Sequence, residues 1–141
     1  MGYESKIYII EKRRSSDYGS VVAMMDLCKF DYDSGFHDLF VHPIDFDAYY
    51  DDGNTLIKED RYNTLCHYAY LEDVMKWLKP YYKEKKRQYG KHGMYRRLRP
   101  MYNLLKSYNN GQWITNKLKN PKKNILKEEN YYDILVLHYG Y

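Results

Sequence analysis

The sequence predicts one α+β domain, in which a mainly antiparallel sheet of about five strands is covered by two helices, with a basic helix-loop segment. A chain of 141 residues fits a single domain. Short segments rich in β-branched and aromatic residues fill the first half, and after residue 70 the apolar residues recur with the period of a helix. We therefore expect an acidic β-rich part (1–70), a basic helical part (71–127) and a final strand (132–139) in domain 1–141.

The first strand is expected within residues 3–13, which are centred on Lys6-Ile7-Tyr8-Ile9-Ile10. Turn residues at 17–19 precede residues 21–30, an expected antiparallel partner whose Met and Leu content leaves a helix open as the alternative. Residues 36–40 are expected to form one helical turn before Pro43.

Residues 44–50 alternate acidic with apolar side chains, which is the period of a half-buried strand. Asp51-Asp52-Gly53-Asn54 follows, and Asp-Gly favours a tight turn because it tolerates positive φ. The return strand of this hairpin is expected at residues 55–58.

Helical periodicity begins where four apolar residues share one face: Leu71, Val74, Met75 and Leu78. Pro80 is expected to kink or end this helix near Lys79. The second helix is expected from the spacing of Leu98, Met101, Tyr102, Leu105 and Tyr108, with Pro100 in its first turn and Asn110-Gly111 as its stop.

Between these helices, residues 83–97 are too polar to be core and are expected to form an exposed helix extension plus a loop; residues 117–127 are expected to form a second basic loop. Residues 134–139 are almost continuously apolar, as in a strand that is buried on both faces, and His138 is expected to be a core histidine. No internal repeat is found.

Charge is divided unequally along the chain. Residues 1–75 contain 7 Lys/Arg and 15 Asp/Glu, whereas residues 76–141 contain 16 and 4. Residues 76–99 alone carry ten cations against one acid, Glu84, with tyrosines interleaved. Cations bind phosphates and aromatic rings stack on bases, so we predict a partner- or nucleic-acid-binding surface here, with a merely solvated helix face as the alternative. Its candidate residues are Lys83, Lys85, Lys86, Arg87, Tyr89, Lys91, Tyr95, Arg96, Arg97 and Arg99.

The acidic half allows two further interpretations. Its aspartates either assemble a magnesium or manganese site or form a surface that imitates nucleic-acid phosphate. These residues are Asp26, Asp31, Asp33, Asp38, Asp45, Asp47, Asp51 and Asp52. No nuclease motif accompanies them and the five histidines form no catalytic or zinc pattern, so we expect no catalytic residue, no metal and no cofactor.

Four strings together resemble a group of small proteins that phages and prophages of low-GC bacteria encode. They are residues 1–12 (MGYESKIYIIEK), 22–29 (VAMMDLCK), 51–55 (DDGNT) and 135–141 (LVLHYGY). The resemblance covers about half of the chain and carries no catalytic residue across. A small phage protein of this sort is similar in kind to anti-CRISPR and other anti-defence proteins.

The function expected from these observations is that of a phage or prophage anti-defence protein, which inhibits a host CRISPR effector through its basic and aromatic surface. A direct DNA- or RNA-binding phage regulator is the alternative, and a metal-dependent enzyme that uses the N-terminal aspartates is the third hypothesis. The longest aliphatic run, residues 21–25, is far shorter than the roughly 18 residues of a membrane span. With no secretory signal at the start of the sequence, we expect the cytoplasm of the host bacterial cell and no membrane partner.

Overall fold

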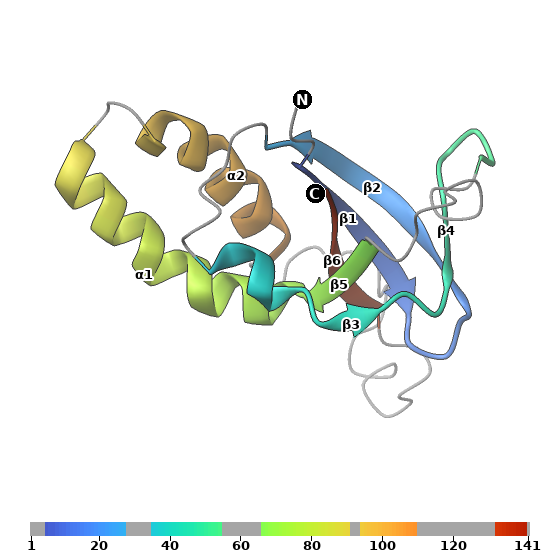
Figure 1. The fold of residues 1–141 in the computed structure, drawn as a ribbon. Helices are drawn as coiled ribbons and strands as arrows, with labels where there is room; N and C mark the ends of the chain where they lie inside the picture. Colours follow the sequence, from blue (N-terminus) through green and yellow to red (C-terminus); the bar gives the residue numbers. More distant parts are fainter. Residues whose placement is uncertain (1–4, 28–34, 55–65, 91–93, 110–131, 141) are drawn as a thin grey trace, which may run out of the picture.

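A computed structural model describes residues 5–27, 35–54, 66–90, 94–109 and 132–140. The fold is α+β: a mixed, curled sheet of six strands carries two helices on one side (Figure 1). The strands are β1 (Ser5–Arg13), β2 (Tyr18–Asp26), β3 (His42–Pro43), β4 (Asp47–Tyr49), β5 (Cys66–Tyr70) and β6 (Tyr132–Gly140). The helices are α1 (Leu71–Tyr89) and α2 (Met94–Asn109), with a short 3₁₀ helix, η2 (Phe36–Leu39), before β3.

The sheet has the strand order β3-β5-β6-β1-β2-β4. Strand β1 pairs antiparallel with β2 and with β6, and β5 pairs antiparallel with β6. The expected antiparallel character is therefore confirmed for the centre of the sheet, but there are six strands and β4 pairs with β2 in parallel. The parallel pair arises because the chain leaves β2, forms β3 at the opposite edge beside β5 and only then returns to β4.

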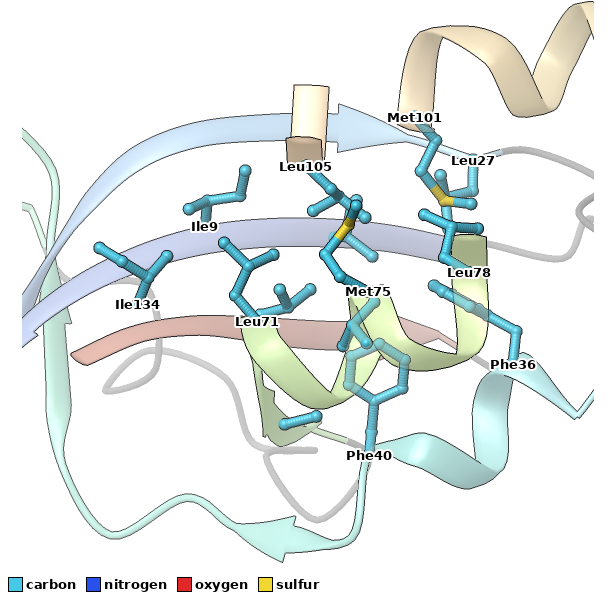
Figure 2. Packing of buried hydrophobic residues seen from close by; sticks show 14 of the residues in the cluster. Ile9, Leu27, Phe36, Phe40, Leu71, Met75, Leu78, Met101, Leu105 and Ile134 are labelled. Atoms are coloured by element: carbon cyan, nitrogen blue, oxygen red, sulfur yellow. The ribbon is translucent and has the colours of Figure 1, made fainter. Parts of the chain in front are cut away.

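Alternation along the central strands divides the apolar side chains between two faces. Ile7 and Ile9 of β1 point to the helix side, where they meet the buried residues of α1 and α2 (Figure 2). Tyr8 and Ile10 point to the other side and pack with Phe46, beside β4. Since β6 lies between β5 and β1 and both of its faces are covered, its apolar run is continuous, as predicted.

Helix α1 passes through Pro80 and continues to Tyr89. The prediction that the helix ends near Lys79 is therefore wrong. Pro80 is exposed, and the carbonyl of Lys76, which loses its hydrogen bond to residue 80, lies on the same solvent-facing side. Water can satisfy that carbonyl. The proline consequently costs one hydrogen bond and does not break the packing of the helix.

The predicted helix extension is present, since α1 continues through residues 83–89. Gly90, with φ of 59°, ends α1, and its N–H donates to the Lys86 carbonyl at 2.9 Å. Helix α2 begins at Met94, one turn before the predicted start, so Pro100 lies in its interior and not in its first turn. Within the predicted segment, residues 83–89 thus belong to α1 and residues 94–97 to α2.

The predicted turn at residues 51–54 is confirmed, since Gly53 has φ of 87° and its N–H donates to the Tyr50 carbonyl at 3.0 Å. The strand before it is shorter than predicted and covers only Asp47–Tyr49. The return strand at 55–58 and the loop at 117–127 lie outside the described residues. No described helix is long and apolar enough to cross a membrane.

A cluster of aromatic and histidine rings attaches η2 to the sheet. The Phe40 ring stacks on His138 of β6 with centroids 5.1 Å apart, and the His37 ring meets His138 edge-on at 4.6 Å. His138 is buried, as predicted. Burial, together with the neighbouring His37 and His67, lowers the pKa of His138 to about 4. Burial also lowers the pKa of His37, against the opposing charge of Asp38.

The low pKa of His138 makes the fold sensitive to acid. An unfolded chain binds a proton at a histidine pKa of about 6.5, whereas folded His138 does so only near 4, so stability is full above 6.5 and falls as the pH drops toward 4. We expect a loss on the order of 2 kcal/mol between pH 7.5 and pH 5, measured by urea unfolding. His138→Phe should flatten this dependence and His42→Phe should retain it; equal slopes in the wild type and in His138→Phe would contradict the assignment.

Candidate nucleic-acid interface

Helices α1 and α2 form an antiparallel hairpin whose closed end projects beyond the sheet (Figure 1). The buried residues of α1 all lie in its first half, at Leu71, Val74, Met75 and Leu78. None of residues 79–89 is buried. This distal half is held by α2, because Tyr82 stacks on Tyr102 with ring centroids 3.9 Å apart and planes 2° from parallel. Residues 79–89 and 94–106 are called the arm below.

The two helices of the arm carry the same pattern twenty residues apart. Residues 78–86 read Leu-Lys-Pro-Tyr-Tyr-Lys-Glu-Lys-Lys, and residues 98–106 read Leu-Arg-Pro-Met-Tyr-Asn-Leu-Leu-Lys. Leucine, a cation, proline, tyrosine and a final lysine are shared. In both copies the leucine is buried and the shared tyrosine is half-buried. The proline, the cation before it and the final lysine are exposed in both. The sequence prediction of no internal repeat is therefore wrong at this short scale.

The two stacked tyrosines have cations at matching helix positions. Each tyrosine has one cation three residues before it and another four residues after it, and residues at these spacings share a helix face. The Nζ of Lys106 lies 5.7 Å from the Tyr102 ring centroid. The four are called the cation quartet: Lys79 and Lys86 on α1, and Arg99 and Lys106 on α2.

Lys83 extends this surface along α1, since it follows Lys79 by four residues and precedes Lys86 by three. All five cations are exposed, and together they are called the basic surface. No acidic residue lies three or four positions from Lys79, Lys83 or Lys86 on the helix. The acidic Glu84 lies on another side of α1, where its carboxylate accepts a hydrogen bond from Arg87 at 2.7 Å.

A second row of side chains runs along the opposite flank of α1 with a constant spacing of four residues. Trp77 and Tyr81 stack with centroids 4.5 Å apart. The Nζ of Lys85 lies 5.4 Å from the Tyr81 centroid and 5.5 Å from that of Tyr89. At the sheet end of this row, the Trp77 ring packs on the fully buried Phe36, with ring centroids 5.7 Å apart. The row is thus a continuous ladder of rings and one ammonium group, fixed at one end in the core.

The predicted site residues divide between these two flanks. Lys83, Lys86 and Arg99 belong to the basic surface, and Lys85 and Tyr89 belong to the ladder. Arg87 forms an exposed ion pair with Glu84, and the Glu84–Arg87 hydrogen bonds lower the pKa of Glu84 and raise that of Arg87. Lys91 and the side chains of three residues lie outside the described part: Tyr95, Arg96 and Arg97.

The sequence prediction omitted Lys79, Lys106 and the stacked pair Tyr82 and Tyr102. A composition window finds the density of cations but not the helix face on which they lie. The repeated spacing of cation, tyrosine and lysine is the signal that identifies all four, because it relates positions in both helices.

The predicted aspartate cluster does not come together in the part of the chain that the structure describes. Asp38 lies in η2, Asp47 in β4, and Asp52 accepts hydrogen bonds from the backbone and the side chain of Asn54 at 2.9 and 3.0 Å. Asp45 lies before β4, outside the strand that Asp47 begins. Among the described residues, no three His, Cys, Asp or Glu side chains form a group that could hold a metal ion. Asp31 and Asp33 lie outside them.

Comparison of the chain with protein-family models, with curated proteins and with solved structures gave no match.

Proposed function

We propose that the protein is a non-enzymatic inhibitor of a nucleic-acid-handling defence effector, in the first instance a CRISPR effector complex, and that its basic surface contacts nucleic acid held by that effector. One observation carries the proposal: five exposed cations, each within four residues of one of two stacked tyrosines, lie on the two helices of an arm that projects from the fold. Cations clustered in this way bind phosphates by releasing the counterions that surround a nucleic acid.

The kind of cation favours phosphate over a protein partner. Four of the five residues of the basic surface are lysines, and lysine is depleted at protein–protein interfaces. Its ammonium group suits phosphate, which it binds as a point charge. A protein surface that recognises an acidic partner protein would more typically present arginine and exposed aromatic anchors.

The arm is also suited to reach nucleic acid inside a larger assembly. Beyond Leu78, α1 leaves the body of the fold, and the Tyr82–Tyr102 stack fixes the distance between the two helices. The cations are thereby carried on a rigid projection and not on a loop. Less ordering is then required on binding, which favours affinity.

A plasmid-interference assay tests the proposed function. The chain is expressed in cells that contain one defined CRISPR effector, across a panel of effector types, and the transformation efficiency of a targeted plasmid is measured. We expect the efficiency to rise for at least one type and to stay low when the protein carries charge-reversed residues of the basic surface. If no type is inhibited while the purified chain binds nucleic acid, the inhibitor proposal is overturned in favour of a direct DNA- or RNA-binding regulator.

A further inference from the structure

The repeat in the arm indicates a local two-fold relation between α1 and α2. Each residue of the first copy corresponds to the residue twenty positions later, so Tyr82 corresponds to Tyr102. These two equivalent residues stack on each other with nearly parallel rings, 2° apart. In an antiparallel hairpin, equivalent residues that meet in this way lie on the two-fold axis. The axis therefore passes through the tyrosine stack.

The same relation places the cation quartet symmetrically about the stack. Because the helices run in opposite directions, Lys79 lies on the same side of the stack as Lys106, and Lys86 lies on the same side as Arg99. Within one helix, the two quartet cations are seven residues apart, which is about 10 Å along the axis. The quartet thus consists of two pairs of cations, separated by about 10 Å.

A ligand with matching symmetry is a nucleic-acid duplex. Its two strands run antiparallel and are related by two-fold axes through the grooves, with phosphates along both edges of each groove. The grooves are about 6 to 12 Å wide, which is similar to the separation of the two cation pairs. Flexible lysine side chains can make up the difference between the two distances. We propose that the cation quartet binds double-stranded nucleic acid, with one pair of cations on the phosphates of each strand.

The aromatic side chains of the arm support a duplex over a single strand. Proteins that bind single strands offer ring faces on which unpaired bases stack. Here Tyr82 and Tyr102 stack on each other, so one face of each ring is covered. Trp77 stacks on Tyr81, and the Lys85 ammonium lies against the rings of Tyr81 and Tyr89. Of the quartet, Lys106 lies 5.7 Å from the Tyr102 ring centroid, so that ring supports a cation as well as its stacking partner. Tyr89, a predicted residue of the binding surface, is 48% exposed and has the Lys85 ammonium 5.5 Å from its ring centroid.

This inference rests on the proposed function and is tested by fluorescence anisotropy on the purified full chain. The probes are a DNA duplex of about 20 base pairs, an RNA duplex of the same length and one of the DNA strands alone, each titrated over a range of KCl concentrations. Two paired variants, Lys79→Gln with Lys106→Gln and Lys86→Gln with Arg99→Gln, are compared with Arg13→Gln with Arg14→Gln as control. Arg13 and Arg14 lie at the β1–β2 turn, away from the arm.

We expect at least one duplex to bind about tenfold more tightly than the single strand, because the duplex carries phosphates on both edges of a groove. Each paired variant should weaken duplex binding by a similar factor and lower the salt slope by about 2, whereas the control should not. Tighter binding of the single strand, or a loss confined to one pair, would overturn the two-strand assignment while leaving the proposed function intact. No binding to any of the probes at low salt would overturn both.

Discussion

Reversal of Lys79, Lys83 and Lys86 to glutamate should abolish inhibition of the effector and weaken binding to free duplex by at least about a hundredfold near physiological salt. The change removes three of the five cations of the basic surface and puts three negative charges opposite phosphate. All three side chains are exposed, so the helix should remain folded. The loss is measured as transformation efficiency in the interference assay and as the anisotropy midpoint with duplex.

A variant with a similar change in charge, away from the arm, separates the position of the charges from their number. Arg13→Glu with Arg14→Glu reverses two exposed cations at the β1–β2 turn and should retain inhibition. The reversal removes the ion pair between Arg14 and Asp133 at 3.0 Å, in which the Arg14 side chain is 47% exposed and that of Asp133 17%, so the urea midpoint of this variant is measured to show that it is folded before inhibition is compared. If both variants lose activity equally, net charge and not the basic surface is responsible.

Truncation of Phe36 to alanine should destabilise the fold by about 3 to 5 kcal/mol, in the range measured for buried phenylalanines. Phe36 has no exposed surface, and its ring contacts Phe40 at 5.2 Å, Trp77 at 5.7 Å and His138 at 6.3 Å. It is thus the point at which η2, α1 and β6 meet. Removal of the ring leaves a cavity among three elements that cannot all collapse into it.

The loss is read from the urea midpoint at pH 7.5, where His138 is neutral in the folded and nearly neutral in the unfolded chain. Tyr18→Ala is the matched control, because that residue is 60% exposed and its ring contacts Tyr49 at a centroid distance of 5.9 Å, so it should cost much less stability than Phe36→Ala. A Phe36→Ala protein as stable as the Tyr18→Ala protein would show that η2 does not contribute to the core.

The elements that could be predicted from the sequence are those with a clear period and a clear environment. The four-residue apolar face of α1 and the continuous apolar run of β6 were both located correctly, because each packs directly on its neighbours. Strand β5 was not predicted. Its sequence Cys-His-Tyr-Ala-Tyr has no aliphatic alternation, and pairing with β6 forms the strand.

The consequence of Pro80 depended on its surroundings, which the sequence does not contain. A proline inside a buried helix face would break the packing, whereas here it lies on the exposed side. The parallel pairing of β4 with β2 was likewise beyond prediction, since it follows from the path of the chain across the sheet.

For the candidate site, the sequence indicated a segment by its charge density but did not separate two faces of one helix. Charge density pointed to the region of Lys83 and Lys86, and these residues do lie on the basic surface. It also included Lys85, whose ammonium lies between two tyrosine rings, and Arg87, which is paired with Glu84. The stacked partner of Tyr82 on α2 had to be seen in three dimensions before the cation quartet was recognisable.

The salt dependence of binding tests most directly whether the basic surface contacts phosphate. The affinity of the purified chain for a DNA duplex is measured from about 50 to 200 mM KCl. With five phosphate contacts, the slope of log K against log salt should be close to about −4.5, and it should fall toward about −1.8 when Lys79, Lys83 and Lys86 are replaced by glutamine. Binding that is independent of salt, or a slope that the three substitutions leave unchanged, would contradict the assignment of the arm as a phosphate-binding surface.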